Sequence, residues 1–144
     1  MSKAVESISV VEAWDMLIPA VSAVESRLGK ALRRYGLGQS EFRTLRILAG
    51  TQDNEVRLLD LADDVGLDRS SVSRLVTRLE DAELVRRESC GDDRRGVYTV
   101  LTEKGHSLYE SAHDVYAQTL IEALASVELP EEVFDSLAQR SAAN

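Results

Sequence analysis

The sequence lacks the features of a secreted or membrane-bound protein. Cys90 is its one cysteine, so no disulfide can form within the chain, as is typical of the reducing cytoplasm. No apolar run approaches the roughly 18 residues that a transmembrane helix requires. No basic segment followed by an apolar stretch stands near Met1, so we expect no secretion signal. These absences predict a cytoplasmic protein without membrane contact.

An excess of positive charge is also missing. The 144 residues include 17 lysines and arginines against 25 aspartates and glutamates, for a formal net charge of −8. Such a chain should be repelled by the phosphates of random DNA. The excess is uneven, because residues 105–144 contain seven acidic side chains and one basic one. A local basic surface built from the middle of the chain is therefore compatible with the net charge.

The motifs of common enzymes and cofactor sites are missing too. The sequence has no glycine-rich phosphate loop, no zinc-protease spacing and no nucleophile elbow, so we predict neither an enzyme nor a cofactor. His106, Glu110 and His113 would share one helix face. The two histidines would be two turns, roughly 10 Å, apart, so surface histidines are favoured over a metal site. Cys90 lies near Arg86 and Arg87 in sequence, and a redox-responsive or metal-responsive variant stays an open alternative.

Helical periodicity is the main pattern that is present. Apolar residues at steps of three and four predict long helices over 10–35 and 103–126, and Pro130 is expected to begin a last helix. Ser40 is the expected N-cap of a second helix. The elements expected in between are a helix over 58–65, a helix after the N-cap Asp68 that runs to about Leu79, and strands over 84–88 and 97–101.

The helix after Asp68 has a polar face suited to DNA. Its apolar positions would pack on the preceding helix, while short hydroxyl side chains would let the opposite face lie deep in the major groove. Arginine can donate two bonds to guanine or one to phosphate. An ordinary solvated face is the alternative for this helix taken alone. We expect bases to be faced by Ser70, Ser71, Ser73, Arg74 and Thr77, and phosphates by Arg69 and Arg78.

A charged loop between the two expected strands strengthens the DNA-binding interpretation. A hairpin tip with arginines can reach the minor groove beside a recognition helix, and an aspartate there can orient one guanidinium. A charged turn that only keeps the hairpin soluble is the alternative. The predicted wing residues are Arg86, Arg87, Asp93, Arg94 and Arg95.

Five segments of the chain resemble the MarR (multiple antibiotic resistance regulator) family, and the flanking helices follow the family's order. The segments are 58–62, 69–80, 84–87, 93–96 and 101–105. The most specific signal is Asp-Arg-Arg-Gly at 93–96, followed at this spacing by Leu-Thr-Glu-Lys-Gly at 101–105. Glu83 departs from the family, which usually has glycine between the recognition helix and the next strand. The local end of that helix is therefore open.

The resemblance implies a fold and an assembly. The expected fold class is mainly α (α+β), a winged helix-turn-helix with long terminal helices, in one domain over 1–144. Residues 1–36 and 103–144 would form the dimerisation helices and residues 40–102 the DNA-binding lobe. Wide apolar faces, over 14–35 and 108–137, independently favour a homodimer because a small domain cannot bury them alone.

The resemblance also implies a sequence-specific transcription regulator. A two-fold dimer would bind an inverted-repeat operator in double-stranded DNA, with repression as the family's usual output and activation as the other. A small-molecule effector would bind between dimer core and DNA lobe, where Trp14, Arg27, Tyr35 and Arg46 are the candidates. Core aromatics and surface arginines are an equally open interpretation of these four. A competing hypothesis, favoured by the charge of −8, is a winged-helix module that binds a protein instead of DNA.

Overall fold

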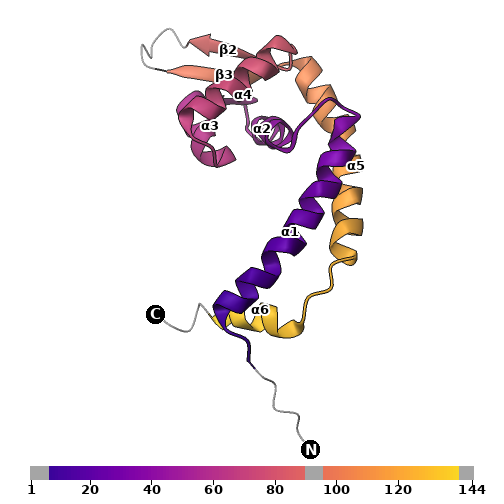
Figure 1. The fold of residues 1–144 in the computed structure, drawn as a ribbon. Coiled ribbons are helices and arrows are strands. Elements are labelled where there is room, and N and C mark those ends of the chain that lie inside the picture. Colours follow the sequence, from indigo (N-terminus) through magenta and orange to yellow (C-terminus); the bar gives the residue numbers. More distant parts are fainter. Residues whose placement is uncertain (1–6, 90–95, 140–144) are drawn as a thin grey trace, which may run out of the picture. The chain divides into compact units, whose positions relative to one another are not determined.

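The computed structural model describes residues 7–89 and 96–139 of the chain, and Figure 1 shows the order of their helices and strands. Cys90 and the predicted wing residues Asp93, Arg94 and Arg95 lie outside the described residues. The predicted fold class is confirmed, since helices predominate and the described strands form one small antiparallel sheet. The helices are α1 (Val10–Arg33), α2 (Gln39–Ala49), α3 (Leu58–Val65), α4 (Arg69–Asp81), α5 (Glu103–Ala125) and α6 (Glu131–Ala138), and the strands are β1 (Glu55–Arg57), β2 (Val85–Ser89) and β3 (Val97–Leu101).

The chain divides into two compact units. The terminal unit consists of the described parts of Met1–Leu28 and Gln118–Asn144, and the central unit of the described parts of Gly29–Ala117. The expected helix-turn-helix lies wholly in the central unit. None of the helices within 7–89 and 96–139 combines the length and the apolar character that crossing a bilayer demands.

One apolar core holds the central unit together. Phe42 of α2, Leu61 of α3 and Leu75 of α4 are almost fully buried in it. The Phe42 ring stacks on Tyr116 of α5 with ring centroids 4.4 Å apart, and its centroid lies 5.6 Å from that of Tyr109. Large side chains at helical spacing on four helices thus fix α4 against the rest of this unit.

The sheet has the strand order β1-β3-β2, with both pairs antiparallel. Val85 of β2 lies opposite Leu101 of β3, so the strands expected at 84–88 and 97–101 do pair as a hairpin. Strand β1 was not predicted. It is three residues long and exists through its pairing with β3, which is a contact between distant parts of the sequence. Local periodicity carries little signal for so short a strand.

The start of α2 differs from the prediction. Ser40 is not its N-cap, because the helix begins at Gln39 and the capping position is Gly38. The carboxylate of Glu41 accepts a hydrogen bond from the Gly38 backbone N–H at 2.8 Å. A glutamate side chain, not a serine hydroxyl, therefore makes the side-chain hydrogen bond at the start of α2. Helix α1 also ends two residues early, at Arg33, followed by a turn in which Gly36 has φ 69°.

Both ends of the helix-turn-helix connection follow from local chemistry. Gly66 closes α3 at φ 79°, a left-handed conformation that glycine adopts without strain. At the far end of α4, Ala82 is the C-cap and Glu83 then adopts φ 63°. An L side chain is disfavoured there, so Glu83 stands where a glycine would be favoured.

The terminal unit leaves much apolar surface uncovered. Val24, Ala123 and Val133 are buried within it, and Arg27 of α1 donates a hydrogen bond to the Ser126 hydroxyl at 3.2 Å. Pro130 is the N-cap of α6, so the helix begins at Glu131, one residue later than we expected. The large apolar residues of this unit that are exposed are Val10, Val11, Trp14, Met16, Ile18, Val21, Ile121, Leu124 and Phe134.

Candidate nucleic-acid interface

Helices α3 and α4, joined across Gly66, form the predicted helix-turn-helix (Figure 1). Val72, Leu75, Val76 and Leu79 of α4 are buried, as the apolar spacing predicted. The opposite face is polar and accessible. Ser70, Arg69, Arg74, Thr77 and Arg78 are exposed, whereas Ser71 and Ser73 are half-buried.

The first turn of α4 is organised by Asp68, which is the N-cap that the sequence predicted. Its carboxylate accepts hydrogen bonds from the Ser71 backbone N–H at 2.8 Å, the Ser70 hydroxyl at 2.7 Å and the Ser71 hydroxyl at 3.0 Å. The backbone N–H of Ser71, followed by the two hydroxyls, lowers the pKa of Asp68 to about 2. Asp68 is therefore ionised at neutral pH at the edge of the expected reading face.

The same hydrogen-bond network orients the side chain of Arg74. Its Nη2 atom donates to the Ser71 hydroxyl at 3.3 Å, and that hydroxyl in turn donates to Asp68. Asp68, Ser71 and Arg74 thus form a chain along the first two turns of α4. The hydroxyls of Ser70 and Ser71 already have partners within the protein, so their hydrogens would reach a base only after these bonds rearrange.

Arg78 lies one turn further along and is anchored from α2. Its Nε atom is 3.4 Å from a carboxylate oxygen of Glu41, while 60% of its side chain is exposed. Glu41 also holds the Gly38 backbone N–H, so one carboxylate connects the start of α2 to α4. An exposed pair of this kind is worth little in stability, and it leaves much of the guanidinium accessible to a phosphate.

The two arginines of β2 differ in their surroundings. Arg86 is exposed and pairs with Glu88 on the same strand. Arg87 is half-buried, and its guanidinium donates to the Glu80 carboxylate at 3.0 Å, to the Ser73 carbonyl oxygen at 2.9 Å and to the Thr77 hydroxyl at 3.1 Å. Sequence reasoning placed both on the wing, but the side chain of Arg87 lies against α4.

The segment Leu-Thr-Glu-Lys-Gly at 101–105 connects the start of α5 to the end of α4 through hydrogen bonds. The Thr102 hydroxyl donates to the Glu83 carbonyl oxygen at 2.7 Å and accepts from the Gly105 backbone N–H at 3.0 Å, so Thr102 caps α5. Lys104 Nζ donates to the carbonyl oxygen of Ala82, the C-cap residue of α4, at 3.0 Å. This segment therefore closes the C-terminal end of the expected recognition helix.

Sequence reasoning missed three residues that position the interface, namely Glu41, Glu80 and Lys104. Glu41 contacts Arg78, which is 37 positions away, and Lys104 contacts Ala82, which is 22 positions away, whereas Glu80 lies seven residues before its partner Arg87. An acidic residue that ends the arginine-rich face was the one available signal for Glu80. Nothing in the local pattern marked Glu41.

The four residues of the expected effector cleft are divided between the two units. Trp14 and Arg27 belong to the terminal unit, where Trp14 is 60% exposed and Arg27 contacts Ser126 and Glu122. Tyr35 and Arg46 belong to the central unit, where Tyr35 packs on the core and Arg46 is exposed. The cleft stays a prediction. Within 7–89 and 96–139, no group of three or more His, Cys, Asp or Glu residues could hold a metal ion.

Comparisons with known proteins agree with this arrangement. A model of the MarR family matches residues 37–97. The HTH-type transcriptional regulator FarR of Neisseria gonorrhoeae is 36% identical over 96 residues, which are 65% of this chain and 63% of FarR. The crystal structure of AbsC, a MarR family transcriptional regulator from Streptomyces coelicolor, is similar with a TM-score of 0.78 and 29% identity, over 91% of this chain and 89% of AbsC. Residues 37–97 therefore match the MarR family, and the fold is that of MarR family regulators.

Two further solved structures resemble this chain and contain bound molecules. Sco3205, a MarR family transcriptional regulator from Streptomyces coelicolor in complex with DNA, has a TM-score of 0.76 and 28% identity over 90% of this chain and 81% of its own. NadR in complex with 4-hydroxyphenylacetate has a TM-score of 0.66 and 26% identity over the whole of both chains. The chain spans less than two thirds of the length of FarR.

Proposed function

We propose that this chain is a transcription regulator that binds an inverted-repeat operator as a homodimer, with α4 in the major groove and the wing beside it. Repression is the output that we expect. The observation that carries the proposal is the exposed face of α4, a helix capped at its N-terminus, where Arg69, Arg74 and Arg78 stand beside short hydroxyl side chains. The DNA complex of the similar regulator Sco3205 supports it.

The charges of α4 favour binding to a specific operator sequence over non-specific attraction to any DNA. The arginines of α4 belong to a chain whose net charge is −8. Because the chain as a whole is repelled by phosphates, it should bind random DNA weakly. Arg74 is aimed by Ser71, which suits a base contact, whereas Arg78 is held through one exposed pair and suits a phosphate. Binding should therefore depend strongly on the operator sequence.

The homodimer is supported by the uncovered apolar surface of the terminal unit. Large apolar side chains such as Trp14, Ile121, Leu124 and Phe134 are more than half exposed there, and contiguous apolar surface on a protein of this size marks an interface. The occupant that we propose is a second copy of this chain, because an isologous contact lets one apolar face cover another. A two-fold dimer places the two α4 helices about one DNA turn, roughly 34 Å, apart.

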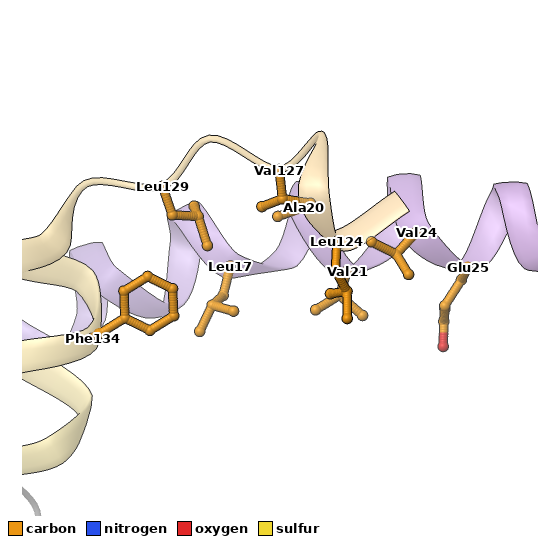
Figure 2. Close-up of a pocket in the computed structure, with 9 residues that line it drawn as sticks. All are labelled: Leu17, Ala20, Val21, Val24, Glu25, Leu124, Val127, Leu129 and Phe134. Carbon is orange, nitrogen blue, oxygen red and sulfur yellow. The ribbon is translucent and has the colours of Figure 1, made fainter. Parts of the chain in front are cut away.

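An apolar cavity of about 300 Å³ lies within this surface. Figure 2 shows side chains from α1, from the end of α5 and from α6 around it, among them Leu17, Val21, Leu124 and Phe134. Its lining is apolar apart from Glu25, so it suits apolar side chains from a partner helix better than a polar ligand.

Modulation by a small molecule is also part of the proposal. The similar structure of NadR with 4-hydroxyphenylacetate supports an effector, and the identity of the effector for this chain stays open. A regulator of this kind acts in the cytoplasm, where the operator is, and needs no catalytic group of its own.

Equilibrium binding tests the proposal directly. The full chain is titrated against a labelled duplex from the region upstream of its own gene and against a scrambled duplex of equal length, by fluorescence anisotropy at several salt concentrations. Specific affinities typically exceed non-specific ones by at least about 10³. Equal affinity for both duplexes would favour the competing hypothesis, a module that binds protein partners.

Two arginine variants separate base reading from phosphate contact in the same assay. Arg74→Ala should relax the preference among single base substitutions by roughly 1–3 kcal/mol at one position. Arg78→Ala should weaken binding to all sequences alike and lower the salt slope by about one. Lys30→Ala is the matched control, because it removes one exposed charge from α1 and should change neither quantity.

A further inference from the structure

Arg87 connects strand β2 to three successive turns of the recognition helix. Its guanidinium donates to the backbone oxygen of Ser73, to the hydroxyl of Thr77 and to the carboxylate of Glu80. These acceptors are at positions i, i+4 and i+7 of α4, so they share one face and span about 10 Å of helix axis. A single side chain therefore contacts about half of the length of α4.

Glu80 binds both the side chain and the backbone of Arg87. One carboxylate oxygen accepts from Arg87 Nη1 and the other accepts from the Arg87 backbone N–H, both at 3.0 Å. Side chain and backbone of the same residue are thus fixed by one carboxylate, and 25% of the Arg87 side chain is exposed. Charge-assisted bonds of this kind are shorter and stronger than neutral ones, and they constrain geometry in two directions.

The same contacts decide what Thr77 can offer to DNA. Its hydroxyl donates to the Ser73 carbonyl oxygen at 2.9 Å and accepts from Arg87 Nη2 at 3.1 Å. The hydroxyl hydrogen is therefore already used and cannot be donated to a base. What the exposed Thr77 side chain keeps for a base edge is its methyl group, which suits the thymine methyl, and one remaining lone pair.

Resting on the proposed operator binding, we propose that Arg87 is a positioning residue for base reading. With Glu80 it sets the rotation of α4 on the sheet, and with Ser73 it fixes Thr77 so that the methyl group serves as its reading element. This role replaces the wing contact with DNA that the sequence predicted for Arg87, because its charge is already matched by Glu80. Arg86, one residue earlier, is exposed and is free of this task.

The test compares how two neighbouring arginines affect discrimination. Arg87→Met keeps the apolar stem and removes the guanidinium, and Arg86→Met is the comparison one residue away, whose predicted wing contact with DNA should weaken both affinities together. Affinities for the operator and for a scrambled duplex are measured for each full-length variant over a range of salt. For Arg87→Met we expect the operator-to-scrambled ratio to fall at least fivefold, with affinity for scrambled DNA changed less than twofold and the salt slope unchanged.

A phosphate contact would behave differently and would overturn the inference. Both affinities would then fall together and the salt slope would drop by about one. An Arg87→Met variant that discriminates as well as Arg86→Met would overturn it too. A wild-type chain that shows no operator preference would instead overturn the proposed function itself, so the two failures are distinguishable.

A double-mutant cycle adds a readout that a general loss of stability would not produce. Glu80→Gln and Arg87→Met act through one contact, so the double variant should lose no more discrimination than Arg87→Met alone. Additive losses would contradict the proposal. Thr77→Val keeps the methyl group and Thr77→Ser keeps the hydroxyl. We expect Thr77→Ser to reduce the preference at one base position more than Thr77→Val does, and the reverse order would overturn the role assigned to the methyl group.

Discussion

A Cβ atom added at Gly105 would lie 2.1 Å from the carbonyl oxygen of Leu84. The first turn of α5 therefore lies directly against the backbone that leaves α4, with no space for a side chain. Leu84 also accepts the Thr102 backbone N–H at 3.1 Å, so the close approach and the hydrogen bond act together. The glycine of the segment at 101–105 is required by this contact.

Gly105→Ala should destabilise the protein because the Leu84 backbone must move. Overpacking of this kind costs about 1–3 kcal/mol in the free energy of unfolding. Urea denaturation at a fixed protein concentration measures the change. Gly29→Ala is the matched control, since a Cβ there meets nothing within 4 Å and alanine should stabilise α1 by about 0.5–1 kcal/mol. Equal effects of the two substitutions would refute the account of this contact.

Glu83→Gly should stabilise the protein. Glu83 holds φ 63°, where an L residue is strained by about 1–2 kcal/mol and glycine is not. The lost pair with Lys104, 3.6 Å long and exposed on both sides, offsets little of this gain. Asn54→Gly, at φ 55°, should gain less because asparagine tolerates this conformation. Thermal unfolding checks both, and a lower melting temperature for Glu83→Gly would contradict the prediction.

Protonation of Asp68 at low pH should weaken the N-cap of α4. The folded-state pKa of Asp68 is lowered from 3.8 to about 2, so its contribution to stability is present above pH 3.8 and is lost as the pH falls through about 2. Asp68→Asn can still cap the helix but does not titrate. The difference in unfolding free energy between wild type and variant should therefore change between pH 4 and pH 2. A constant difference over that window would show that the cap does not titrate as described.

Charge placed in the apolar surface of the terminal unit should weaken the dimer. Leu124→Asp puts a carboxylate beside Val21 and Phe134, which line the same cavity, and burial of an unpaired charge is costly. We expect the dimer dissociation constant to rise at least tenfold in sedimentation equilibrium. Leu59→Asp, at a similarly exposed apolar residue of α3, is the control. A dimer that tolerates Leu124→Asp as well as Leu59→Asp would place the interface elsewhere.

Features set by local patterns were predictable from the sequence. The helix Leu58–Val65 and the strand Val97–Leu101 lie where periodicity and turn residues placed them, and Asp68 and Thr102 cap the helices that follow them. These outcomes depend on neighbours within a few residues, for which side-chain type is a direct signal.

Features set by contacts between elements were not predictable. Strand β1 depends on its pairing with β3. Arg86 and Arg87 are the same residue type in adjacent positions, yet alternation along β2 places one in solvent and the other against α4. The sequence shows that Arg86 and Arg87 are both positively charged, but it does not show which residue each side chain contacts.

Selection of DNA from a random duplex library tests the central claim most directly. The full-length protein is used to enrich sequences at moderate salt, and the enriched pool is sequenced. We expect an inverted repeat whose half-sites are about one helical turn, roughly 10 base pairs, apart, with the preference at one position of each half-site relaxed by Arg74→Ala. A pool without enrichment, or one enriched in sites without two-fold symmetry, would contradict it.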